Sequence, residues 1–210
     1  MASALIHMAV AKKANEKLGF QDENSLFLGT IAPDLGKLLG ETKEKGHFET
    51  NNTYLPNLNK YLSKYKIDKP FEMGYYIHLY TDLIWFTEFM PNYYKNEILY
   101  LNDGTFMDCS FDLKMKKVYS DYSIFNGLVI DEYNLNLDIF YKNINFESEL
   151  DEVDLTKIDL LLKQVRGFIE ESDRNKKPEV FSLEAILEFI DTTAERVVKE
   201  VLNGYFNIGK

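Results

Sequence analysis

The stretch FEMGYYIHLYTDLIWF, residues 71–86, decides the fold class. Pro70 precedes it, in a position that suits the first residue of a helix, and Pro91 follows it, where a helix must end or kink. Between the two prolines, large apolar side chains point in every direction around a helix, which is typical of a helix enclosed by other elements. The sequence therefore predicts a buried central helix in an all-α bundle of several helices.

Two polar residues interrupt this apolar helix. His78 and Asp82 are four residues apart, so their side chains project from one face, about 6 Å apart along the axis. A buried carboxylate is costly unless a partner compensates its charge, and a cation with the imidazole as a second ligand would do so. For the pair alone, the simpler alternative is a histidine that hydrogen-bonds an aspartate inside the core.

The other two histidines of the chain strengthen the metal hypothesis. His7 lies on a helical track of small residues, which lets other groups approach it closely. Asp34 follows a proline at the expected end of the second helix, and His47 begins the sequence HFET in a glycine-flanked loop. The joint order of His, Asp and His, followed by His-x-x-x-Asp, indicates a metal site more strongly than any one member does.

Helical patterns account for most of the remaining chain. No repeat and no Gly/Ser-rich or Pro-rich linker divides it, so we expect one helical domain over residues 1–210. The acidic run within residues 147–154 is typical of a solvated linker. Helices are expected at about 3–18, 24–32, 56–65, 70–90, 111–142 in two or three pieces, 154–173 and 182–203, with a polar connection over 34–55.

Composition limits the function classes. The 210 residues are 45% hydrophobic and 14% aromatic, which excludes a disordered chain. The net charge of −10 disfavours nucleic acid and anionic membrane surfaces as partners. Cys109 is the only cysteine, so no internal disulfide can form, and we expect a packed thiol. We find no apolar segment long enough to span a membrane and no secretory pattern, and expect a soluble, cytoplasmic protein.

The chain resembles a known family, the zinc-dependent phospholipases C, and more distantly the S1/P1-type nucleases that share their fold. IHMAVAKKA (residues 6–14) is similar to the first histidine helix of the family. GTIAPD (29–34) with GHF (46–48) resembles its aspartate followed by His-Phe, and FEMGYYIHLYTD (71–82) resembles its helix with His-x-x-x-Asp. The resemblance covers about residues 4–90, and residues 91–210 match only in helical character.

The resemblance implies a role for each matched residue. His47, His78 and Asp82 would form one zinc site, and Asp82 would bridge to a second metal that His7 also binds. Asp34 would lie beside the metals as the catalytic general base or as a carboxylate that orients water. One or two Zn²⁺ ions, or other divalent metals, are therefore expected rather than three.

Departures from the family pattern limit the third metal. Glu88 stands where the family has a histidine, and it is open whether this carboxylate binds metal or is simply solvated. The secreted enzymes use the amine of an N-terminal tryptophan, whereas this chain begins with Met1, so we expect that ligand to be missing. Further acidic candidates are Asp103, Asp108 and Asp121.

The expected function is a metal-dependent phosphoester hydrolase, in which a metal-activated water attacks phosphorus. The acidic chain favours a small phosphoester or a lipid headgroup over a polymeric nucleic acid as substrate. The aromatic residues near the site could line a substrate pocket, although they more often belong to a core: Tyr75, Tyr76, Trp85 and Phe48. The alternative is a non-catalytic metal-binding or scaffold protein with a degenerate active site.

Overall fold

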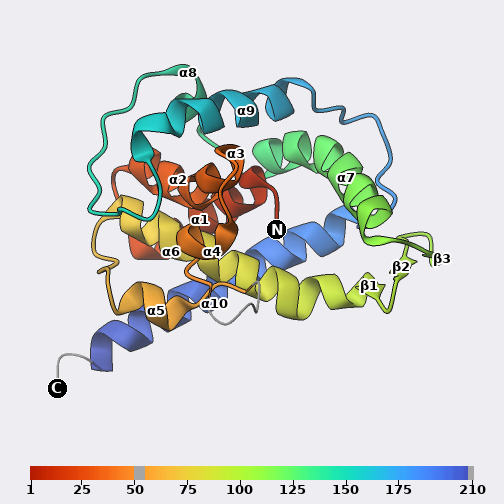
Figure 1. The fold of residues 1–210 in the computed structure, drawn as a ribbon, viewed down its shortest axis with the longest axis horizontal. Helices are drawn as coiled ribbons and strands as arrows, with labels where there is room; N and C mark the ends of the chain where they lie inside the picture. The colour runs from red at the N-terminus through yellow and green to blue at the C-terminus, as the bar shows by residue number, and fades with distance from the viewer. Residues whose placement is uncertain (50–54, 208–210) are drawn as a thin grey trace.

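Helix α6 (Pro70–Ile84) is the buried central helix that the sequence predicts. All of its residues except Pro70 and Leu83 are buried in the computed structural model, which describes residues 1–49 and 55–207. The chain is mostly helical, and α6 packs against α1, α2, α5 and α10 (Figure 1). The other helices of this core are α1 (Ala4–Leu18), α2 (Glu23–Ile31), α5 (Leu58–Leu62) and α10 (Leu183–Asn207).

Helices α2 and α6 cross with almost no space between their backbones, because each has a glycine at the contact. A Cβ atom added to Gly74 would lie 2.0 Å from the carbonyl oxygen of Leu26, and one added to Gly29 would lie 2.1 Å from that of Phe71. Any larger side chain would force the helices apart. The close crossing brings the end of α2 next to the middle of α6, where His78 lies.

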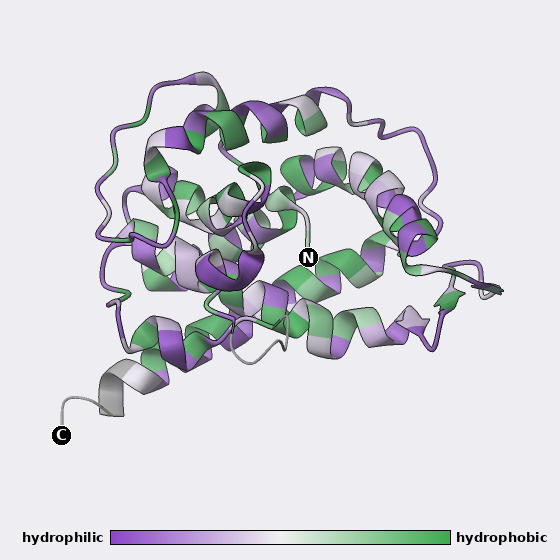
Figure 2. Cartoon of the chain, in the orientation of Figure 1, coloured by the Kyte–Doolittle hydropathy of each residue, from purple (hydrophilic) through white to green (hydrophobic). Residues whose placement is uncertain are grey.

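Helix α1 joins the beginning of the chain to its end. Its start is capped by Ser3, whose Oγ accepts a hydrogen bond from the Ile6 N–H at 3.3 Å. The helix packs against α2 and α6, and along its length against α10, the last helix in sequence. Figure 2 shows hydrophobic and hydrophilic residues on different sides of α10, whose buried residues recur at three- and four-residue spacing: Ile186, Phe189, Ile190, Ala194, Val197 and Val201.

Helix α6 does not continue to Pro91 as a regular α-helix. After Ile84 the chain forms a wider π-type turn, η2 (Trp85–Phe89), and then a tight turn, η3 (Met90–Asn92). A proline offers no N–H for helical hydrogen bonding, so the helix ends here. Beyond it lies a small antiparallel sheet, absent from the expected elements, of strands β1 (Tyr94–Lys95), β2 (Ile98–Tyr100) and β3 (Phe106–Asp108), with Leu99 opposite Tyr94 and Met107.

The polar connection expected at 34–55 contains short helices in its described part. The turn η1 (Ala32–Asp34) leads directly into α3 (Leu35–Leu38), and α4 (Lys43–Gly46) follows; residues 50–54 lie outside the described residues. Helix α2 begins one residue before its expected start at 24, and the Asp22 carboxylate caps it by accepting the Ser25 N–H.

The second half of the chain covers one side of this core. The region expected to be helical at 111–142 forms α7 (Phe111–Glu132) and α8 (Asp138–Tyr141). The region expected at 154–173 forms η4 (Leu155–Lys157) and α9 (Ile158–Glu170). Helix α10 begins after Ser182, whose Oγ accepts the Ala185 N–H, and continues past its expected end at residue 203. Among the described residues, no helix is both long and apolar enough to cross a membrane.

A buried carboxylate holds α7 against the segment before α10. Asp121 is 1% exposed, and its two oxygens accept the backbone N–H groups of Glu179, Val180 and Phe181 at 2.8–3.0 Å. Burial raises the pKa of this carboxyl, and the three N–H donors oppose that change. The role of Asp121 is thus to fix this segment.

Candidate metal centre

Five of the six residues singled out in the sequence meet at one point inside the helical core. His7 comes from α1, Asp34 from η1, His47 from the end of α4, and His78 and Asp82 from α6. All three imidazoles and Asp82 are at most 1% exposed, and Asp34 is intermediate. Their ligand atoms fall into two overlapping groups of three that share His78, each within 4.8 Å: His7, His78 and Asp82; and Asp34, His47 and His78.

A backbone carbonyl determines which nitrogen of His78 is free. The His78 Nδ1 lies 2.7 Å from the carbonyl oxygen of Thr30, which can only accept a hydrogen bond, so Nδ1 carries the proton. Burial, and next the neighbouring His7, lower the pKa of His78 well below its usual value, so the ring is neutral and Nε2 carries a lone pair. This carbonyl–histidine arrangement is the one that orients histidine ligands in metal sites.

The bare Nε2 of His78 points at the other potential ligands. It lies 3.1 Å from His47 Nε2 and 3.8 Å from Asp82 Oδ2, and His47 Nε2 lies 3.6 Å from both Asp82 Oδ2 and Asp34 Oδ1. Ligands bound tetrahedrally to zinc at 2.0–2.2 Å are separated by about 3.3–3.6 Å. The spacing of these nitrogen and oxygen atoms therefore suits a cation the size of zinc.

His7 approaches the same carboxylate from the opposite side. Its ring stacks on that of His78 with centroids 3.9 Å apart, and its Nε2 lies 3.4 Å from Asp82 Oδ1. Neither ring nitrogen of His7 has a hydrogen-bond partner among the described residues, nor have Asp82 Oδ2 and Asp34 Oδ1. Buried polar atoms without partners are costly, so this set suits coordination of a cation better than a closed hydrogen-bond network.

The charges of the cluster support cation binding. Burial alone would raise the pKa of Asp82, but His47 and His7 reverse that effect and hold the pKa well below its usual value. The pKa of Asp34 is also lowered: against the effect of burial, the ammonium group of Lys43 favours the ionised carboxylate. Two carboxylates are thus ionised in a buried place, where a cation stabilises them.

The turn that carries His47 is fixed by close packing. A Cβ on Gly46 would lie 2.9 Å from the carbonyl oxygen of Pro33, so α4 can approach η1 only with glycine there. Phe48 has a left-handed φ of 56° and packs its ring, 3% exposed, against Tyr61 and other aromatic side chains. These contacts place the imidazole of His47 beside Asp34.

Glu88, the sixth candidate, lies away from the cluster. Its carboxylate forms a double ion pair with Arg196 of α10 at 2.7 and 2.9 Å, and its side chain is 53% exposed. Glu88 lies in the π-type turn that follows Ile84. Of the two alternatives left open for Glu88, the structure shows the solvated one, in which the carboxylate forms a surface ion pair.

The remaining candidates have structural surroundings. Asp103 binds the N–H and hydroxyl of Thr105 in a turn, and Asp108 is an exposed residue of β3. Burial raises the pKa of the Cys109 thiol, as expected of a packed cysteine. The four aromatic residues first considered for a substrate pocket are buried in the core: Phe48, Tyr75, Tyr76 and Trp85.

Further neighbours of the cluster were not among the candidate ligands. Lys43 of α4 places its Nζ 3.7 Å from Asp82 Oδ2, and the Ala2 N–H donates to Asp82 Oδ1 at 3.2 Å. Burial lowers the pKa of the Met1 amino group to about 5, while Asp82 acts in the opposite direction. The carbonyl of Thr30 is a backbone group, so no sequence motif could have indicated it.

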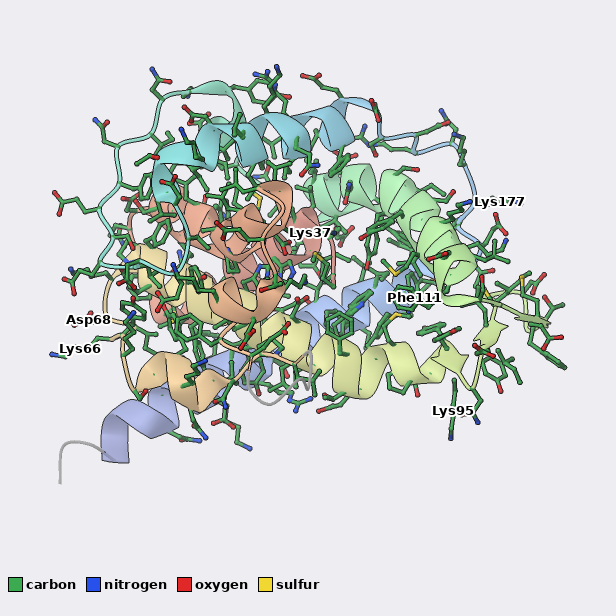
Figure 3. All side chains as sticks on the ribbon, viewed as in Figure 1. Lys37, Lys66, Asp68, Lys95, Phe111 and Lys177 are labelled. Carbon is green, nitrogen blue, oxygen red and sulfur yellow. The ribbon has the colours of Figure 1, made fainter. Side chains whose placement is uncertain are left out.

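A cavity of about 570 Å³ opens beside Asp34. It lies between the start of α1, the segment of α2 and α3, and helices α7 and α9, and it is lined mainly by apolar atoms. Lys37, labelled in Figure 3, lies at this cavity, and Asn126 contributes an amide whose Oδ1 is buried without a partner. The main apolar lining residues are Ile31, Leu38, Tyr122, Leu161, Val165 and Phe168.

No protein-family model, no curated protein and no solved structure matches the chain.

Proposed function

We propose that the protein is a metal-dependent phosphoester hydrolase related to the zinc-dependent phospholipases C and sharing their fold. The observation that carries the proposal is the Thr30 carbonyl on His78 Nδ1, because it leaves a bare Nε2 only 3.1 Å from His47 Nε2. His47, His78 and Asp82 would hold one zinc ion, and His7 with Asp82 would hold a second. Such a cation supplies the positive charge that activates water and neutralises a phosphoryl oxygen.

Asp34 is the proposed proton acceptor. Its Oδ1 lies 3.6 Å from His47 Nε2, and it borders the cavity as well as the cluster. A carboxylate whose pKa is lowered is ionised at neutral pH, so it can orient a water molecule and take its proton. The water oxygen then bonds to phosphorus, the bond from phosphorus to the ester oxygen breaks, and the leaving oxygen takes up the proton from Asp34 and departs as an alcohol.

The cavity indicates the kind of substrate. Its volume lies in the range of small-molecule sites, and its lining is mainly apolar. It therefore favours a small phosphoester with an apolar organic group, seated between α7 and α9, and its phosphate directed toward Asp34. The net charge of −10 further disfavours a polymeric nucleic acid.

Metal analysis tests the site itself. The chain, purified without chelators, is expected to contain at least about one zinc or similar ion, and Asp82→Asn or His78→Ala is expected to remove it. Asp131→Asn, which alters an exposed aspartate paired with Arg174 on the surface, is the matched control and should keep the metal. The proposal would be contradicted if wild-type protein purified in this way held no metal and did not gain stability when metal was added.

Turnover tests the reaction. Metal-replete protein is expected to hydrolyse a generic phosphodiester, and Asp34→Asn is expected to lower the rate by about 10²–10⁴-fold while zinc remains bound. If zinc-loaded wild-type protein hydrolyses none of a broad panel of phosphoesters, the alternative of a non-catalytic metal-binding or scaffold protein is the better one.

A further inference from the structure

Lys43 extends its charged end into the candidate metal centre from the side nearest to solvent. It is the first residue of α4, one helical turn before His47, and its side chain is 26% exposed. Its neighbour Lys45, on the same short helix, is exposed, and no contact joins it to the cluster among the described residues. Of the two lysines on α4, Lys43 is the one whose ammonium group lies beside the cluster.

The ammonium group of Lys43 is shared by three side chains. Its Nζ lies 3.5 Å from His47 Nε2, 3.7 Å from Asp82 Oδ2 and 3.8 Å from Asp34 Oδ1. Hydrogen bonds between an ammonium and a carboxylate are usually about 2.7–2.9 Å long. All three distances from Lys43 Nζ are longer, so the ammonium is not tightly paired with any of the three side chains. The Lys43 ammonium group faces the same nitrogen and oxygen atoms that would bind a metal, and its positive charge stabilises the two carboxylates.

A bound metal and this ammonium would repel each other. A zinc ion at about 2.1 Å from His47 Nε2 would lie within about 5.6 Å of the position that Nζ now occupies. Even with the dielectric constant of water, the repulsion between a divalent ion and an ammonium at that distance corresponds to about a tenfold change in affinity. The flexible, partly exposed side chain of Lys43 can relieve it by turning outward.

We infer that Lys43 is the anion-binding side chain of this centre: it neutralises Asp34 and Asp82 without metal, and binds a phosphoryl oxygen of the substrate when metal is present. The inference rests on the proposed function, because it requires a metal at this cluster. A lysine ammonium is a compact point charge that commonly binds phosphate. The ammonium group of Lys43 lies beside the carboxylate of Asp34, which borders the cavity.

Zinc affinity tests the first half of this exchange. In competition with a chromogenic chelator, Lys43→Met is expected to bind zinc more tightly than wild type, by up to about tenfold, because the competing cation is gone. Lys43→Arg keeps the charge and should stay within about threefold of wild type. Lys45→Met removes the same charge from the same helix without touching the cluster, so it separates a local effect from the net charge of the chain.

Phosphate binding tests the second half. Titration of zinc-loaded protein with inorganic phosphate is expected to show affinity about tenfold lower for Lys43→Met than for Lys45→Met, with Lys43→Arg close to wild type. Circular dichroism of each variant establishes that it is folded.

The outcomes separate the two proposals. If the wild type binds zinc but Lys43→Met equals Lys45→Met in both titrations, the inference about Lys43 is wrong and the metal site stands. If Lys43→Met weakens zinc binding, the lysine supports the metal ligands and the inference is also wrong. If wild type and all variants fail to bind zinc, the metal centre and the inference are both lost.

Discussion

Replacing Gly74 by alanine should damage the metal centre without touching any of its ligands. The added Cβ would lie 2.0 Å from the Leu26 carbonyl oxygen, whereas ordinary contact begins near 3.4 Å. Helices α2 and α6 must therefore separate by about 1.4 Å. A shift of that size would lengthen the 2.7 Å contact between His78 Nδ1 and the Thr30 carbonyl beyond hydrogen-bond distance.

The expected cost has two parts. Overpacking of a well-packed contact costs about 1–3 kcal/mol, and the buried polar groups left unpaired cost about 1–3 kcal/mol more. Gly74→Ala should thus lower the free energy of unfolding by about 2–6 kcal/mol. Because the carbonyl orients His78, zinc affinity should also fall by about 10–100-fold.

Urea denaturation and competitive zinc titration measure the two effects. Gly167→Ala in α9 is the matched control, since nothing lies within 4 Å of a Cβ there, and it should stabilise the protein by about 0.5–1 kcal/mol. A Gly74→Ala protein as stable as wild type, with unchanged zinc affinity, would refute the argument that this helix crossing positions His78.

Two further predictions follow from the charged groups. Metal-free protein should lose stability as the pH falls below about 6.5, by up to about 1.4 kcal/mol per pH unit for one proton, because His78 has a lowered pKa when folded and takes up a proton when unfolded. Asp82, whose pKa is also lowered, adds to the loss below about pH 4. Urea titrations in chelator from pH 7.5 to about 3 that show flat stability would contradict both assignments. Glu88→Gln should cost less than about 1 kcal/mol and leave the zinc content unchanged, since its pair with Arg196 is on the surface; loss of zinc in elemental analysis would return Glu88 to the ligand set.

The sequence predicts the site better than it predicts the connections around it. His78 and Asp82 follow from helical spacing alone, and the apolar residues around them predict their burial. His7, Asp34 and His47 depend on their order along the chain, and the structure brings them to the same carboxylate or imidazole. The pairing of His78 with Asp82 was predictable because a helix holds residues four apart on one face.

The unforeseen features are those that local pattern does not encode. Strands of two or three residues, as in β1–β3, are too short to show alternation. The π-type turn that separates Glu88 from the cluster depends on tertiary packing, and the Lys43 contact depends on where α4 docks. Both features depend on how segments remote in sequence pack together, and local patterns in a single sequence do not reveal that packing.

The pairing of α1 with α10 has a consequence for biosynthesis. The helix that carries His7 is translated before Leu183–Asn207, the helix that covers one side of it. At about 5–20 residues per second, roughly 10–40 s pass before that cover emerges. The nascent chain must keep α1 from aggregating during this interval, so a chaperone that shields the first eighteen residues should raise the yield of folded protein.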